Sequence, residues 1–283
     1  MHSQMRFEVL GPVRGWHGQT ELDLGSPQQR AVLAMLLLAR GRQVSLGGLV
    51  NGIWGDRPPR AAEGTIRTYV SRLRTVFAKS AGQPGELIVS VGDGYLLRLG
   101  QAALDLDVFE ERVSAARAAR HRRDAARFFH DALGLWNGDA LAGIPGPYAD
   151  ARRVPLAELR LAATEAKLAA EIAIGEHAVA IAELRALVAD HPFREGLGEL
   201  LMLALYRSGR RAEAFHVFDS LQQRLGGELG IDPGPSLRVM HEHVMQADRR
   251  LMASDPCPVH LAAVAASMVA QRKKKRLNER TRR

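Results

Sequence analysis

Apolar positions along the first hundred residues change their spacing several times, and each change marks a new structural element. Residues 6–24 alternate between apolar and polar positions, with Gly-Pro and His-Gly punctuation, which predicts short strands in a small sheet. Residues 26–29 (SPQQ) favour a helix start, because Ser26 can cap the helix and Pro27 suits its first position. The apolar run that follows, up to Gly41, is too broad for a surface helix, so we expect the core helix here.

A second, shorter helix is predicted from Ser45, where apolar residues recur at i, i+3, i+4, i+7 and i+8. Gly47, Gly48 and Gly52 each lower its helix propensity by about 1 kcal/mol, so tertiary packing has to hold it together. The sequence GDRPPR at residues 55–60 ends this helix, because two prolines forbid its continuation.

The next predicted helix, residues 62–79 (AEGTIRTYVSRLRTVFAK), is the most informative stretch of the chain. Its apolar stripe consists of Ile66, Val70, Leu73 and Phe77. The opposite face is rich in arginine and hydroxyl side chains and has no carboxylate after the first turn. Such a face suits the major groove of DNA, because arginine can read guanine O6 and N7 while threonine offers a hydroxyl and a methyl group. Taken alone, the same residues also fit an ordinary solvated helix face.

A β-hairpin is predicted directly after this helix. Residues 87–91 (LIVSV) and 95–99 (YLLRL) are strand-like, and the turn Gly92-Asp93-Gly94 separates them. The helix from Ser45 and the basic helix 62–79, joined by the turn at residues 55–60, form a predicted helix-turn-helix pair. A hairpin directly after such a pair is a wing. The order of strands, three helices and hairpin therefore predicts a winged helix-turn-helix of the response-regulator output type over residues 5–100.

Residues 101–252 change to alanine, leucine, glutamate and arginine, which predicts an all-α domain. Gly175 and Gly209 are 34 residues apart, and the same shift superposes Ala180 on Ala214. That period is typical of tetratricopeptide helices, and a plain helical bundle is the other interpretation. The chain as a whole is predicted to be mainly α with a small β component.

The net charge of +8 is unevenly distributed along the chain. Residues 1–100 hold 12 Lys/Arg against 7 Asp/Glu, residues 101–253 hold 19 against 22, and residues 254–283 hold 8 against 2. A basic first domain beside an acidic second one suggests a polyanionic partner for the first domain only. We expect the basic tail, residues 253–283, to be disordered with solvated charge; added affinity for phosphate is the sharper interpretation.

Several classes of chemistry are not indicated by the sequence. The single cysteine, Cys257, excludes an intrachain disulfide, and no motif for nucleotide hydrolysis, metalloprotease or serine hydrolase activity occurs. His241 and His243 are two apart on a predicted helix, so they point away from each other and make poor partners for one metal ion. No apolar run reaches the roughly 18 residues of a membrane span. We therefore expect no enzyme activity, no cofactor and no metal site, in a cytoplasmic, nucleoid-associated protein.

Segments of both domains resemble one family. RFEVLGPV, SPQQRAVLAMLLLARGRQVS, LVNGIWGDRPP, TIRTYVSRLR and VGDGYLLRL resemble successive blocks of the SARP family, the Streptomyces antibiotic regulatory proteins. LDVFEERVSAAR, ALGLWNGDALAG, LMLALYRSGRRAEAF and LGIDPGPSLRVMHEHV resemble the bacterial transcriptional activator domain of that family. The resemblance implies an activator of a secondary-metabolite (antibiotic) gene cluster, which binds promoter direct repeats as a homodimer and recruits RNA polymerase. The glycines of the second helix depart from the charged residues expected there.

The expected DNA contacts divide by position on the basic helix. Arg67, Thr68 and Ser71, in its first half, are the candidates for base edges, while Arg72 and Arg74 are expected to grip phosphates.

The remaining candidates lie at the ends of the helix and in the loops. Thr65 is expected to offer its backbone N–H to a phosphate, and Gly94 and Tyr95 to lie near the minor groove or the DNA backbone. The candidates for contact with RNA polymerase are Trp54, Asp56, Arg57 and Arg60. The competing hypothesis is a helical-repeat scaffold protein whose winged helix mediates protein contacts; only DNA binding should weaken steeply as salt rises.

Overall fold

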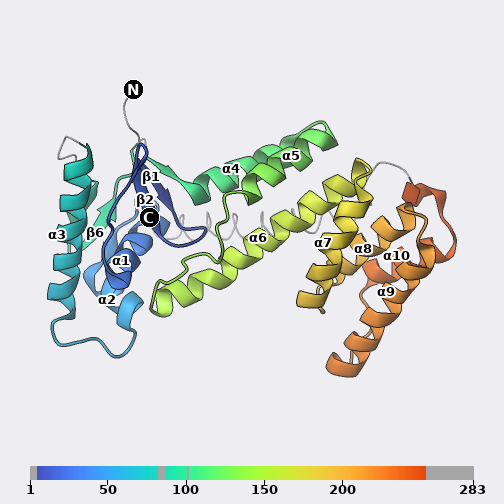
Figure 1. Cartoon of the computed structure of the whole chain (residues 1–283). Helices are drawn as coiled ribbons and strands as arrows, with labels where there is room; N and C mark the ends of the chain where they lie inside the picture. Colours follow the sequence, from blue (N-terminus) through green and yellow to red (C-terminus); the bar gives the residue numbers. More distant parts are fainter. Residues whose placement is uncertain (1–4, 82–86, 101, 253–283) are drawn as a thin grey trace, which may run out of the picture. The chain divides into compact units, whose positions relative to one another are not determined.

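The computed structural model describes residues 5–81, 87–100 and 102–252, and it is mainly helical with two small sheets (Figure 1). The helices are α1 (Pro27–Leu38), α2 (Leu46–Trp54), α3 (Ala62–Ala81), α4 (Asp105–Ala118), α5 (Arg122–Leu133), α6 (Pro147–Ala173), α7 (His177–Asp190), α8 (Glu195–Arg207), α9 (Arg211–Arg224) and α10 (Pro235–Met245), with a short π-helix (Leu225–Leu229) and a 3₁₀ helix (Arg249–Met252). The strands are β1 (Met5–Glu8), β2 (Arg14–His17), β3 (Thr20–Glu21), β4 (Val44–Ser45), β5 (Ile88–Val91), β6 (Gly94–Leu97) and β7 (Ala103–Leu104). The predicted fold class is confirmed. The basic tail and Cys257 lie outside the described residues.

Contacts group the chain into two compact units. The first unit contains the residues up to 114 together with 131–161, and the second contains 115–130 and the residues from 162 onward. The division therefore does not fall at the expected boundary after residue 100. One reason is that β7, which follows that boundary, pairs in parallel with β1.

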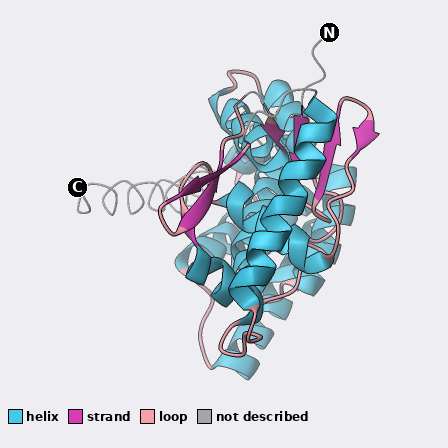
Figure 2. Cartoon of the chain, turned by 90° about the vertical axis from the view of Figure 1, so that its left-hand side faces the viewer, coloured by secondary structure: helices cyan, strands magenta, loops and turns pink. Residues whose placement is uncertain are grey.

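Two sheets flank the helices of the first unit, and Figure 2 shows strands on either side of α3. One sheet has the order β3-β2-β1-β7, and the other has the order β4-β6-β5. Met5 and Phe7 alternate with exposed or half-buried residues in β1, as the period of two predicts, and both are buried. The predicted strands at the start of the chain and the predicted hairpin are confirmed.

Helix α1 is the core helix of the first unit, as predicted. Its residues from Ala31 to Leu37 are all buried, and Ser26 caps it by accepting a hydrogen bond from the Gln29 N–H at 3.3 Å. Gly52 of α2 has a packing role, because a Cβ there would lie 2.3 Å from Cε of Met35 in α1. A larger residue would force the Met35 side chain to move, so this helix-weakening glycine leaves room for the Met35 side chain between α1 and α2.

Asp105, the first residue of α4, is buried and ties this helix to the end of β1. Its carboxylate accepts hydrogen bonds from the backbone N–H groups of Val9 and Leu10 at 2.9 Å, and from that of Leu106 at 2.7 Å. Burial raises the pKa of the Asp105 carboxyl to about 6, against the lowering effect of these N–H groups. The sequence did not indicate this role of Asp105.

The segment 131–161 also packs onto the helices of the first unit. Gly146 has a φ of +99°, and a Cβ at this position would lie 2.6 Å from the carbonyl oxygens of Gly52 and Ile53 in α2. Only glycine allows the backbone to approach α2 this closely in this conformation.

The second unit contains the predicted 34-residue repeat. Gly175 and Gly209 both take positive φ values, +94° and +75°, where α6 and α8 end. Ala180 of α7 and Ala214 of α9 are both fully buried, so the small residues stand where neighbouring helices touch. The all-α domain is confirmed, and these positions are compatible with the predicted tetratricopeptide-like register.

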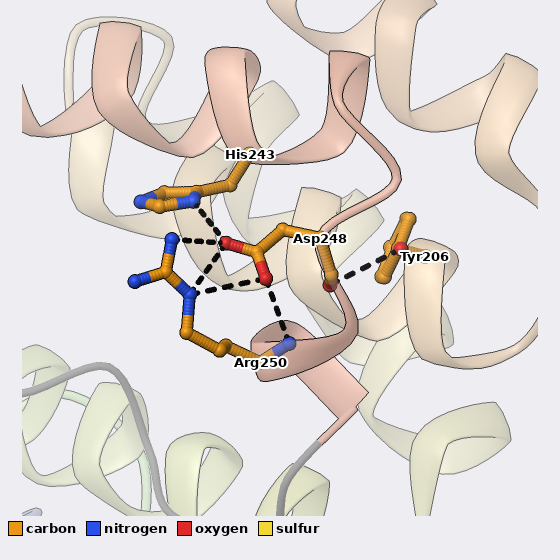
Figure 3. Close-up of polar contacts among 4 residues, drawn as sticks. All are labelled: Tyr206, His243, Asp248 and Arg250. Carbon is orange, nitrogen blue, oxygen red and sulfur yellow. Dashed lines mark hydrogen bonds and ion pairs between the residues drawn. The ribbon is translucent and has the colours of Figure 1, made fainter.

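Charged groups hold the end of the second unit together (Figure 3). The Asp248 carboxylate accepts hydrogen bonds from Arg250 and lies 2.7 Å from Nδ1 of His243, while the Tyr206 hydroxyl donates to the Asp248 carbonyl at 3.3 Å. Hydrogen bonds from Arg250, followed by that of His243, hold the pKa of the Asp248 carboxyl well below its usual range. His241 instead stacks on the Phe218 ring with centroids 3.9 Å apart. The two histidines thus take separate partners.

Candidate nucleic-acid interface

Helix α3 has one buried side and one exposed side. Ile66, Val70, Leu73 and Phe77 are at most 2% exposed, and the Phe77 ring packs edge-on against the Phe7 ring with centroids 5.7 Å apart. The predicted apolar stripe is confirmed. Because this stripe fixes the rotation of the helix, it also fixes which side chains face solvent.

A second contact holds the start of α1 against the middle of α3. The hydroxyl of Tyr69 donates to Oε1 of Gln28 at 2.8 Å. Tyr69 lies between the buried stripe and the exposed face, and the sequence did not single it out. Its half-buried position orients α3 without occupying the exposed face.

The exposed face of α3 carries the predicted base-reading residues. Arg67, Thr68, Ser71 and Arg72 are all exposed and are spread over two turns. The Thr68 hydroxyl donates to a backbone carbonyl of the preceding turn at 3.0 Å, so it presents acceptor lone pairs and its methyl group outward. The face can therefore offer arginine donors beside a hydroxyl acceptor and a methyl group.

Arg67 has a competing partner on the same helix. Its Nη2 lies 3.2 Å from Oε2 of Glu63, one turn earlier. The side chain of Arg67 is 60% exposed and that of Glu63 is 62% exposed. An exposed pair of this kind contributes little to stability and is readily exchanged for another anion. Arg67 can therefore leave Glu63 for a base edge or a phosphate at small cost.

The expected role of Thr65 is wrong. Its backbone N–H donates to the Ala61 carbonyl at 2.9 Å, and its hydroxyl donates to the same oxygen at 3.0 Å. The helix starts at Ala62, so Thr65 follows the first three helical residues, whose N–H groups lack an intrahelical acceptor. Its own N–H is already used within the helix.

Arg74 braces the hairpin. Its Nε donates to the Ile88 carbonyl and its Nη2 donates to the Ser90 hydroxyl, both at 2.9 Å, and its guanidinium lies 5.8 Å from the centroid of the Tyr95 ring. These contacts join α3 to β5 and β6. The phosphate contact expected of Arg74 therefore competes with a structural role that the sequence did not indicate.

The turn of the hairpin is shorter than predicted and is held in place. Only Gly92 and Asp93 form the turn, because Gly94 is the first residue of β6 and pairs with Val91. Gln43, which precedes β4, donates to the Val91 carbonyl at 2.8 Å and to the Asp93 carboxylate at 3.1 Å. The wing is thus fixed against the rest of the first unit.

The position of Gly94 in the structure does not fit the expected contact with DNA. Gly94 is buried, and a Cβ there would lie 2.2 Å from the carbonyl oxygen of Val44 in β4. Its role is to let β4 and β6 pair closely. Tyr95, the next residue, is half-buried and lies beside Arg74.

The loop between α2 and α3 has the exposure that a protein contact needs. Asp56, Arg57 and Arg60 are exposed, whereas Trp54 is half-buried at the end of α2. Pro58 and Pro59 stand between the arginines, as the predicted break requires. The proposed polymerase contacts are therefore accessible, with Trp54 the least so.

Other kinds of site are not found in the described residues. Among residues 5–81, 87–100 and 102–252, no group of three or more metal-binding side chains is found. Within the same part of the chain, no helix has both the length and the apolar character of a membrane span.

Comparison with known proteins defines the class as that of transcriptional regulators. Residues 19–97 match the family model for the C-terminal domain of transcriptional regulatory proteins, and residues 104–245 match that of the bacterial transcriptional activator domain. The regulatory protein AfsR of Streptomyces griseus is 46% identical over 259 residues, which cover 90% of this chain and 26% of AfsR. The chain thus spans about a quarter of the length of that relative.

Two further relatives match over most of both chains. The regulatory protein DnrI of Streptomyces peucetius is 31% identical over 270 residues, covering 92% of this chain and 99% of DnrI. The structure of Mycobacterium tuberculosis EmbR in complex with a low-affinity phosphopeptide superposes with a TM-score of 0.82 at 32% identity, covering 95% of this chain and 71% of that one. The chain belongs to the SARP family of transcriptional activators.

Proposed function

We propose that the protein binds specific promoter sequences through α3 and activates transcription from them. The observation that carries this proposal is the exposed face of α3, where Arg67, Thr68, Ser71 and Arg72 stand opposite a stripe of fully buried apolar residues. A helix held this firmly by its apolar side presents its polar side in one orientation, which is what reading of base edges requires.

The roles within this face follow from position and chemistry. Arg67 and Thr68 lie in the first half of the helix, which is the part that enters the groove most deeply in helix-turn-helix proteins. Ser71 follows one turn later, and Arg72 is placed to contact a phosphate. Arg74 supports the wing, which would lie on the adjacent DNA backbone or minor groove, with Tyr95 beside it.

The remaining parts of the function follow from membership of the family. We propose that the protein binds direct repeats as a homodimer, recruits RNA polymerase through the exposed loop with Asp56, Arg57 and Arg60, and controls a secondary-metabolite gene cluster. The relatives are regulators by name, and the loop is exposed as such a contact needs.

The test begins with selection of bound sequences from random duplex DNA by the whole chain. Arg67→Ala should then relax the preference at one or two base pairs, which corresponds to about 1–3 kcal/mol of lost discrimination. Arg72→Ala should weaken binding to operator and scrambled duplexes alike and reduce the salt slope by about 1.

A matched control is Arg238→Ala, which removes an exposed arginine from α10. It should leave both sequence preference and salt slope unchanged. If selection recovers no preferred sequence at low salt, the proposal is wrong and the hypothesis of a protein-binding winged helix gains support.

A further inference from the structure

The turn between α4 and α5 carries a concentration of positive charge that the proposed function of α3 does not use. Residues 115–127 (AARAARHRRDAAR) contain five arginines and one aspartate. The arginines and the intervening histidine are all exposed; they are Arg117, Arg120, His121, Arg122, Arg123 and Arg127. We call this group the α4–α5 arginine cluster.

The cluster stands out against the charge of its own domain. Residues 101–253 hold 19 Lys/Arg against 22 Asp/Glu, so outside the cluster 14 basic residues face 21 acidic ones. Solubility alone does not account for this separation, because it would be served equally by interspersed charges. Charge of one sign gathered on one turn of an otherwise acidic domain is the electrostatic footprint of a polyanion-binding surface.

The position of two of these arginines is also unfavourable for the helix itself. Arg122 and Arg123 are the first two residues of α5, where the helix dipole is positive and where acidic residues are preferred. Asp124, the third residue, is the acid of this first turn, and it lies 3.5 Å from Arg127. The arginines add to the positive potential of the helix start, and together they favour a bound anion.

The chemistry of the side chains indicates which anion the cluster fits. Each guanidinium can donate two parallel hydrogen bonds to the oxygens of one phosphate. The cluster spans about eleven residues, from the end of α4 across the turn to the start of α5. The neighbouring Phe128 ring is not open to a base, because the Arg127 guanidinium covers it with Cζ 5.1 Å from the ring centroid. Such a surface suits the regularly spaced phosphates of a duplex. Residues 115–127 contain no Ser, Thr, Asn or Gln side chain that would read a base edge beside the arginines.

We propose that the α4–α5 arginine cluster is a second, sequence-independent contact with the DNA backbone. This inference rests on the proposed function only in taking DNA as the partner. Its consequence is a division of labour in which α3 supplies sequence preference and the cluster supplies affinity.

The experiment measures binding of the whole chain to a duplex of about 40 base pairs, in operator and scrambled versions, over a range of salt. Arg120→Glu/Arg123→Glu removes two neighbouring contacts and should lower affinity for both duplexes by the same factor, about tenfold at physiological salt. The slope of log affinity against log salt should fall by about 2, and the ratio of operator to scrambled affinity should stay constant. The neutral variant Arg120→Ser/Arg123→Ser should show the same pattern with a smaller loss.

A matched control keeps net charge from explaining the result. Arg238→Glu/Arg249→Glu makes the same change in charge at two exposed positions of the second unit outside the cluster, and it should change either affinity less than twofold. Far-ultraviolet circular dichroism of each variant should match that of the wild type, since every altered side chain is exposed.

The outcomes separate the two proposals. If the cluster variant binds both duplexes as the wild type does, the inference is wrong; a loss of transcription activation without a loss of DNA affinity would then assign the cluster to an acidic protein partner. If the wild type shows no operator preference but the cluster variant still loses affinity for DNA, the proposed function fails and the inference stands.

Discussion

Replacement of Arg74 by alanine gives the sharpest test of how the recognition surface is assembled. Arg74 projects from α3 to β5, where it donates to the Ile88 carbonyl and the Ser90 hydroxyl at 2.9 Å each. The alanine variant would lose both hydrogen bonds and the cation–π contact with Tyr95. The buried stripe of α3 would be untouched, so the helix should keep its place.

The size of the effect can be worked from these contacts. A hydrogen bond from a charged donor contributes about 1.5–3 kcal/mol when it is buried, and less when its partners can turn to water. Arg74 is half-buried and Ser90 is exposed, so we expect a loss of about 1–2 kcal/mol in total. That is too little to unfold a domain but enough to raise the population of an open wing by roughly 5- to 30-fold.

Amide hydrogen exchange of β5 is the assay, because it reports local opening directly. The β5 amides should exchange about 5- to 30-fold faster in Arg74→Ala, while those of α1 should be unchanged. Arg72→Ala is the matched control, since this neighbouring arginine is exposed on the same helix and should leave exchange in β5 unchanged. Binding to operator and scrambled DNA should weaken together in Arg74→Ala. Unchanged exchange in β5 would refute the bracing role.

Three further predictions concern other parts of the first unit. The pKa of Asp105 is about 6 against an ordinary value of 3.8, so between these pH values the folded protein retains a proton that the unfolded chain loses. The unfolding free energy should therefore fall by up to about 3 kcal/mol as the pH rises from about 4 to 6. Urea titrations of Asp105→Asn should lack this fall. Parallel pH courses for the two proteins would contradict that assignment. Glu63→Gln should raise affinity for DNA severalfold with little change in melting temperature. The change frees Arg67 from an exposed ion pair and removes a negative charge that repels phosphate. An unchanged or lower affinity would mean that Glu63 makes a favourable contact with DNA. Gly146→Ala should lower stability by more than about 2 kcal/mol in thermal unfolding, because it combines a positive φ with a 2.6 Å approach to the Ile53 carbonyl; a neutral result would show that this backbone contact can relax.

Local pattern and spacing were sufficient to predict most of the architecture. The apolar stripe of α3, the proline break before it and the hairpin after it are all short-range features, and each is confirmed. The 34-residue repeat was also visible, because Ala180 and Ala214 must both be small where helices touch. The candidate base-reading residues Arg67 and Ser71 could be chosen in advance because the stripe fixes which face of the helix is exposed.

What the sequence by itself determined is therefore the set of elements and the face that each one buries. Only the tertiary structure decided which groups are already occupied by distant parts of the chain. The Arg74 guanidinium is bound to β5, and Gly94 is covered by the close approach of β4. The same holds for Asp105, whose three N–H partners include groups nearly a hundred residues away in sequence. Periodicity reports burial along one element, whereas hydrogen-bond partners depend on how distant elements meet, and this is why the sequence alone did not predict them.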